Sequence, residues 1–183
     1  VTVDDADQML WFSRFTWGEW AQGRVLQKSE SGWQGEHDGY ARLGVKHIRS
    51  VISLRDDRWL VTDHLVAHEP HRYFLHWLIP DFPHTQNEKQ NLICLWPETD
   101  KLQIRMGLLE GDSNFSLVRG DENSTRGWRS RYYGQKEPAL SARLETERVQ
   151  AVFWTFFGFD GDSITSSGQN LDLQVGRRPM RVS

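Results

Sequence analysis

The chain has 183 residues and a formal net charge of −3, from 22 lysines and arginines against 25 aspartates and glutamates. This balance excludes a general nucleic-acid-binding protein, which needs a basic surface. Charged residues make up 26% of the chain and hydrophobic residues 38%, a composition typical of a folded domain and too apolar for intrinsic disorder. No run approaches the roughly 18 apolar residues of a membrane-spanning helix, so we expect no membrane span. The single cysteine, Cys94, excludes an intrachain disulfide.

We expect residues 1–183 to form one domain, because the chain has no internal repeat, no low-complexity tract and no Pro/Ser-rich linker. The sequence opens Val1-Thr2-Val3, within an alternating strand pattern and without an initiator methionine. This opening suggests that the chain is a piece of a longer protein.

Apolar and polar residues alternate with a period of two, which is typical of β-strands. The short polar turn Arg55-Asp56-Asp57-Arg58 separates the β-rich runs 45–54 and 59–62, so these two strands are expected to form a hairpin. In 149–159 both alternating sets are apolar, which indicates a strand buried on both faces between packed sheets. No segment has a convincing helical stripe, although 141–149 has a helix-like composition. Eight predicted strands follow in chain order: 45–54, 59–62, 72–79, 91–96, 101–108, 115–118, 149–159 and 171–175.

Short strands separated by frequent turn residues predict an all-β fold, an antiparallel β-sandwich of many strands. Cys94 lies in an apolar run and is expected to be a buried, unreactive thiol.

Two groups of histidines are candidates for chemistry. His64, His68 and His71 suggest a metal or acid–base site, but Pro70 and the strand-like surroundings equally fit surface and loop histidines. His37 and Tyr40 flank an Asp-Gly turn and are candidates for a proton-transfer pair. The alternative is ordinary hairpin chemistry, with Tyr40 opening the next strand.

The nine tryptophans divide into two sets by their surroundings. Four lie in apolar strand patterns and are expected in the core: Trp59, Trp77, Trp96 and Trp154. Five lie among polar residues: Trp11, Trp17, Trp20, Trp33 and Trp128. Exposed aromatic faces stack on sugar rings, and a nearby arginine holds a carboxylate or sulfate. Trp17, Trp20, Trp33 and Arg14 are therefore candidate substrate-binding residues, the alternative being that each tryptophan caps a sheet edge.

Five stretches carry a family resemblance in the same order along the chain: 1–8, 37–49, 59–63, 74–77 and 128–138. The second contains His37-Asp38-Gly39-Tyr40-Ala41-Arg42-Leu43 and His47-Ile48-Arg49. The last, which begins at Trp128, resembles a Trp-x-Ser-x-x-Tyr-Gly-x-Lys-x-Pro signature. Together they resemble the C-terminal β-domain of the heparinase II/III-like polysaccharide lyases.

The resemblance implies a many-stranded antiparallel sandwich that follows an N-terminal helical toroid. It implies β-elimination on an acidic polysaccharide that contains uronic acid, with a base, an acid and a charge stabiliser. Tyr40 and His37 are the candidate catalytic residues in this chain. The family's zinc ion, held by two histidines and an aspartate, matches His47 here, while the first histidine would precede Val1 and the aspartate position falls in 16–19, which contains none.

We therefore expect a polysaccharide-lyase domain that is inactive in isolation and whose partners are the helical domain and an acidic polysaccharide. The alternative function is a non-catalytic carbohydrate-binding or scaffolding module.

Overall fold

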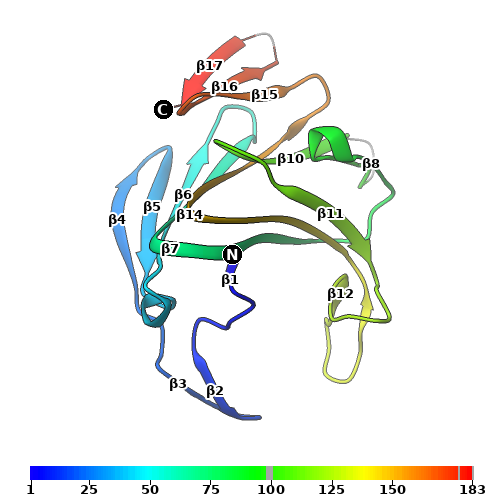
Figure 1. Ribbon diagram of the computed structural model, residues 1–183. Helices are drawn as coiled ribbons and strands as arrows, with labels where there is room; N and C mark the ends of the chain where they lie inside the picture. The colour runs from blue at the N-terminus through cyan, green and yellow to red at the C-terminus, as the bar shows by residue number, and fades with distance from the viewer. Residues whose placement is uncertain (98–100, 177, 183) are drawn as a thin grey trace.

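The computed structural model describes residues 1–97, 101–176 and 178–182. It confirms the predicted all-β fold, with a ten-stranded antiparallel sheet and three small sheets around it (Figure 1). Two single-turn 3₁₀ helices, at Ala41–Leu43 (η1) and Glu88–Gln90 (η2), are the helices of the described residues. Neither is long and apolar enough to cross a membrane.

Two long strands form the centre of the large sheet. β7 (Trp59–Ile79) and β14 (Leu140–Phe159) pair antiparallel from one end to the other. The first half of β7 and the second half of β14 continue into one set of neighbours, ordered β4-β5-β6-β7-β14-β10-β9-β8. Their other halves pair with β1 and β11. The strands of the first set are β4 (Gly23–Ser29), β5 (Gly32–His37), β6 (Lys46–Ser53), β8 (His84–Asn87), β9 (Leu92–Leu95) and β10 (Leu102–Leu108), and those of the second are β1 (Thr2–Val3) and β11 (Asn114–Arg119).

The two halves of the long strands face each other across one hydrophobic core. Leu65 and Phe153 lie in the halves of β7 and β14 that pair with the first set of strands, and Leu75 and Leu144 lie in the halves that pair with the second. All four are fully buried in the same cluster. Burying a large apolar side chain contributes about 1.5–3 kcal/mol to the free energy of folding, which explains why the sheet folds over into two layers. The predicted sandwich is therefore a single sheet with two layers.

The register changes at one place along the central pair, between Arg148 and Gln150. The β14 residues that belong to the main core are even-numbered before this point, as at Leu144, and odd-numbered after it, as at Phe153. An irregularity of this kind allows one strand to keep an apolar face in both layers. Pro70 of β7 lies opposite this interruption, where no ladder hydrogen bond is required of it.

Sequence-based expectations differ from the structure in the extent of one strand and in the burial of Trp59, Trp77, Trp96 and Cys94. The segments 59–62 and 72–79 belong to one strand, because the histidine-rich stretch between them is also extended. The helix-like segment 141–149 is strand, since its partner β7 and the core set its conformation rather than its propensity. Trp59, expected in the core, is 42% exposed because it lies at the end of β7. Of the other three predicted core tryptophans, Trp154 is buried, while Trp77 and Trp96 are half-buried, as is the Cys94 residue.

A second core lies on the outer face of the large sheet. Leu60, Trp154 and Phe156 point away from the main core and are covered by a three-stranded C-terminal sheet, through Leu171 and Leu173. The strand apolar on both faces that the sequence predicts is therefore present, because β14 lies between two cores. The C-terminal sheet consists of β15 (Ser163–Ser167), β16 (Asn170–Val175) and β17 (Arg178–Val182).

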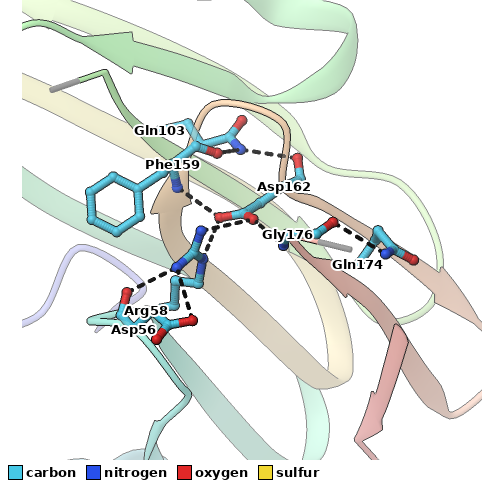
Figure 2. A network of polar contacts seen from close by, with 7 residues as sticks. All are labelled: Asp56, Arg58, Gln103, Phe159, Asp162, Gln174 and Gly176. Carbon is cyan, nitrogen blue, oxygen red and sulfur yellow. Dashed lines mark hydrogen bonds and ion pairs between the residues drawn. The ribbon is translucent and has the colours of Figure 1, made fainter. Parts of the chain in front are cut away.

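A buried carboxylate anchors this C-terminal sheet (Figure 2). Asp162 is 4% exposed, and its oxygens accept hydrogen bonds from Arg58 Nε at 2.7 Å, Phe159 N at 2.8 Å and Gly176 N at 2.8 Å. Gln103 Nε2 donates to the Asp162 carbonyl at 3.0 Å. Burial would raise the pKa of Asp162, but the hydrogen bonds from Arg58, Phe159 N and Gly176 N to its carboxylate hold it below its ordinary value. The network ties the hairpin after β6 to the turn that begins the C-terminal sheet.

Two hairpins complete the fold. The N-terminal hairpin projects from the body of the molecule (Figure 1), and the second follows β11. Their strands are β2 (Leu10–Ser13), β3 (Thr16–Gly18), β12 (Trp128–Arg129) and β13 (Glu137–Pro138).

Candidate functional site

Three neighbouring strands bring the candidate residues together. His37 of β5 pairs with His47 of β6, and Arg49 of β6 pairs with Asp63 of β7. Directly opposed residues on paired strands point to the same face, and alternation places His47 and Arg49 on one face of β6. All four side chains therefore lie on the inner face, beside the main core.

The four side chains form a continuous hydrogen-bonded chain. His37 Nε2 lies 2.8 Å from His47 Nδ1, and His47 Nε2 lies 2.6 Å from Asp63 Oδ1. Arg49 donates to both oxygens of Asp63, from Nε at 2.7 Å and from Nη2 at 3.1 Å. The backbone N–H of Gly39 donates to His37 Nδ1 at 3.1 Å.

This geometry determines the protonation of both imidazoles. Because the Gly39 N–H occupies His37 Nδ1, the proton of neutral His37 is on Nε2, from which it donates to His47 Nδ1. His47 then carries its own proton on Nε2 and donates it to Asp63. With these tautomers the two imidazoles donate in sequence toward one buried carboxylate.

The pKa shifts agree with this arrangement. Burial would raise the pKa of Asp63, but the hydrogen bonds from His47 and Arg49 lower it below its ordinary value. Burial and the neighbouring His47 lower the pKa of His37 to about 4. At neutral pH His37 is therefore uncharged, and Asp63 is an anion neutralised by Arg49.

Tyr40 lies beside this chain but is enclosed. Its ring centroid is 5.7 Å from that of His37, the residue is 1% exposed, and its hydroxyl donates to the Val1 carbonyl at 3.0 Å. Burial raises the pKa of Tyr40. The structure thus brings the predicted pair His37 and Tyr40 together without a hydrogen bond between them. Tyr40 does not open a strand, because the chain turns there into η1 before β6 begins.

A cavity of about 380 Å³ opens above His37 and His47. Arg49 contributes a guanidinium to its lining and Trp33 a partly exposed aromatic side chain, while Arg24 also lines it with its guanidinium paired to Glu36. Glu36 also lines the cavity, and Arg24 and Lys46 neutralise it at 2.5 and 2.7 Å. The cavity therefore combines an aromatic face with cationic donors, a chemistry suited to an anionic sugar.

The other predicted sugar-binding residues lie elsewhere. Trp17 and Trp20 belong to the projecting N-terminal hairpin and its exit, where Trp20 Nε1 donates to the Trp17 carbonyl at 2.9 Å. Arg14 lies at the exposed turn of the same hairpin. Trp33 lies on β5 and lines the cavity. The structure thus keeps Trp17, Trp20 and Arg14 on the hairpin and places Trp33 with the histidines.

His64, His68 and His71 do not form a cluster. All three lie on β7, where an extended chain separates residues seven apart by about 23 Å. His71 Nδ1 pairs instead with Asp4 Oδ2 at 2.6 Å.

A family model described as heparinase II/III-like, C-terminal, matches residues 1–168. The chain belongs to this heparinase II/III-like family. The resemblance carried by the sequence motifs is thereby confirmed for most of the chain. Among curated proteins, none matches the sequence.

Solved structures of heparinases share the fold. A heparinase III gene product superposes with a TM-score of 0.68 at 10% identity, covering 90% of this chain and 27% of that one. Heparan sulfate lyase HepC from Pedobacter heparinus gives 0.64 at 16% identity, covering 88% and 27%. Another heparinase III gives 0.66 at 11% identity, covering 87% and 27%. This heparinase II/III-like chain therefore spans about a quarter of the length of these structures.

The zinc ion that the resemblance implies does not fit the residues described. Both ring nitrogens of His47 are engaged, one by His37 and one by Asp63. Within residues 1–97, 101–176 and 178–182, no group of three or more His, Cys, Asp or Glu side chains is placed to hold a metal ion. Zinc at His47 stays a prediction for a longer chain.

Sequence reasoning did not single out Asp63 and Arg49 as functional residues. Arg49 is two residues after His47, so the sequence indicates that both lie on the same face of one strand, and Asp63 ends a predicted aliphatic strand. What brings Arg49 opposite Asp63 is the β6–β7 register, which depends on the turn between the strands and on the core.

Proposed function

We propose that this heparinase II/III-like chain is the C-terminal domain of a polysaccharide lyase that cleaves an acidic, uronic-acid-containing polysaccharide by β-elimination. The supporting observation is the cavity above His37, which combines Arg24, Arg49 and the Trp33 side chain. A pyranose ring stacks on an aromatic face, and a guanidinium binds the carboxylate of a uronic acid.

The proposed reaction needs a charge stabiliser at the carboxylate. A base removes the C5 proton, the electron pair forms the C4–C5 double bond, and the C4–O bond breaks with protonation of the departing oxygen. Arg49 uses Nε and Nη2 on Asp63, which leaves Nη1 for an anionic ligand. Asp63 fixes the orientation of the Arg49 guanidinium, so this group needs little reorganisation to stabilise the negative charge of the uronic-acid carboxylate.

The described residues do not by themselves provide a base and an acid that are ready for proton transfer. His37 has a pKa of about 4, well below the value near 7 that suits a general base at neutral pH. Both of its nitrogens are occupied, and the Tyr40 hydroxyl donates to a backbone carbonyl. We propose that His37 and Tyr40 take part in proton transfer only when a helical domain completes the cleft, and that this chain alone is inactive.

The proposal is tested by incubating the chain with heparan sulfate, alginate and other uronate polysaccharides while following the ultraviolet absorbance of the unsaturated product. We expect no turnover by the chain alone and turnover by a full-length parent that contains it. Robust turnover by the chain alone would show that its own residues supply the base. A full-length parent inactive on every uronate would contradict the lyase function.

A second function, a non-catalytic carbohydrate-binding module, is supported by the N-terminal hairpin. Trp20 is 70% exposed and Phe15 is 91% exposed, although burial of such side chains is strongly favourable. Aromatic side chains exposed on one hairpin provide a surface on which sugar rings stack. Titration of the intrinsic tryptophan fluorescence with the same polysaccharides tests this function. Binding that disappears in Trp17→Ala and Trp20→Ala, but persists in the Trp128→Ala control, would favour the module; no response to any glycan would count against it.

A further inference from the structure

The outer face of the large sheet carries a row of uncharged polar side chains. Gln27 of β4 pairs with Gln34 of β5, Gln34 with Ser50 of β6, and Ser50 with Thr62 of β7. Directly opposed residues point to the same face, so these four side chains, called the polar row below, lie side by side across four strands. On the next strand Trp154 opposes Thr62 and belongs to the core beneath the C-terminal sheet. The polar row therefore begins where the cover of the C-terminal sheet ends.

A groove of about 470 Å³ lies over the polar row. Its opposite wall comes from Gln169, Leu171 and Val182, so the C-terminal sheet and β4–β7 form its two sides. This volume lies within the range of about 300–1,000 Å³ that is usual for small-molecule sites.

In the part of the chain that the structure describes, the groove carries no charged side chain. None of its 16 lining residues is Asp, Glu, Lys or Arg, although these types make up 26% of the chain. An ordinary solvated sheet face in this protein would be expected to contain about four charged residues in sixteen. Burial also lowers the pKa of His64, which lines the groove, so it is neutral at neutral pH. The groove is thus distinguished from ordinary surface by both its concave shape and its composition.

The polar row keeps most of its hydrogen-bonding capacity. Among the residues that the structure describes, a single side-chain hydrogen bond joins members of the row, from Gln34 Nε2 to Ser50 Oγ at 3.0 Å. Amide and hydroxyl side chains both donate and accept, which matches sugar hydroxyl groups that also do both. A carboxylate or sulfate would lose water in this groove without meeting an opposite charge, at a high cost.

We propose that this groove binds a neutral, hydroxyl-rich saccharide segment. The groove lies on the other face of β5 and β6 from the cavity above His37, because residues of the polar row alternate along these strands with His37 and His47. Of the described residues, Trp33 alone lines both. The proposal does not rest on the lyase function, since a binding module would use the same groove.

The test is a nuclear magnetic resonance titration of the ¹⁵N-labelled chain with cellohexaose, mannohexaose and xylohexaose. We expect at least one of these to shift the side-chain amide signals of Gln27 and Gln34 in a saturable manner. Gln34→Glu keeps the shape of the side chain but adds a charge, and we expect it to weaken binding about tenfold or more. The matched control is Gln90→Glu, at an exposed residue of η2 outside the groove, which should bind as the wild type does.

A second variant protects the test against misfolding. Thr62→Val removes only the hydroxyl, and we expect it also to weaken binding while the signal dispersion of the spectrum remains that of the wild type. The proposal is overturned if none of the three oligosaccharides shifts the two glutamine signals, or if Gln34→Glu and Thr62→Val, both folded, bind like the wild type. Equally tight binding of a heparan sulfate hexasaccharide in this groove would also overturn it.

Discussion

Two aspartates, Asp63 and Asp162, are buried in the fold, and each is held by an arginine. A carboxylate removed from water is tolerated only with charged or hydrogen-bonding partners. Asp63 uses its partners to orient the histidines, whereas Asp162 uses them to join the C-terminal sheet to the body. The same chemistry therefore has a functional use at one site and a structural use at the other.

The anchoring role of Asp162 predicts a large stability loss in Asp162→Asn. The variant leaves Arg58, whose side chain is 13% exposed, with only the exposed Asp56 carboxylate at 3.9 Å, and we expect a loss of about 3 kcal/mol in the free energy of unfolding. Urea denaturation measures it. The control is Asp172→Asn, which breaks the solvent-exposed Asp172–Arg181 pair of the same sheet and should change stability very little. Equal effects of the two substitutions would contradict the anchoring role.

His37 predicts a pH dependence of stability. Its pKa of about 4 in the folded chain is below the ordinary value of 6.5, so the unfolded chain binds more protons between these values. Stability should therefore decrease as pH falls from about 6.5 to about 4, and should do so less steeply in His37→Gln. His64 and His76 have lowered pKa values as well, but both remain in the variant, so the comparison isolates His37. Urea midpoints measured at several pH values test this, and parallel curves for the two proteins would refute it.

Among the elements, the C-terminal sheet depends on the outer face of β14. Its buried leucines cover Trp154 and Phe156, and its edge forms one wall of the groove over the polar row. We expect Leu173→Ala to cost about 2–4 kcal/mol by leaving a cavity in this second core. Met180→Ala is the control, because Met180 opposes Leu173 in the ladder but is 36% exposed. Urea unfolding followed by tryptophan fluorescence would show the difference; a Leu173→Ala effect as small as that of the control would indicate that the sheet is not packed on β14.

The strands themselves were largely predictable from the sequence, and their length was not. Alternation identified the strands around Leu102–Leu108 and 171–175, and the doubly apolar stretch 149–159 indicated two packed layers. Pro70 and the polar histidine-rich stretch indicated the end of a strand. β7 nevertheless continues through them, because the pairing with β14 is interrupted there and no ladder hydrogen bond from Pro70 is required. Propensity alone does not contain that information, since it depends on the pairing with β14.

On the scale of the whole molecule, the sequence identified part of the site. His37, Tyr40 and His47 were recognised because they lie in one motif stretch, 37–49, and the structure brings them together. The pairing of Arg49 with Asp63 depends on strand register, and the groove over the polar row depends on how the C-terminal sheet docks. Neither long-range arrangement can be read from local alternation.

The central claim is that an acidic polysaccharide occupies the cavity above His37. The most direct measurement is the titration of the chain, with ¹⁵N-labelled imidazole groups, by a heparan sulfate hexasaccharide at low ionic strength, where electrostatic attraction is least screened. We predict saturable shifts of the His37 and His47 signals that weaken in Arg24→Gln and persist in the control Arg55→Gln. Absence of any shift at these two histidines would contradict the claim.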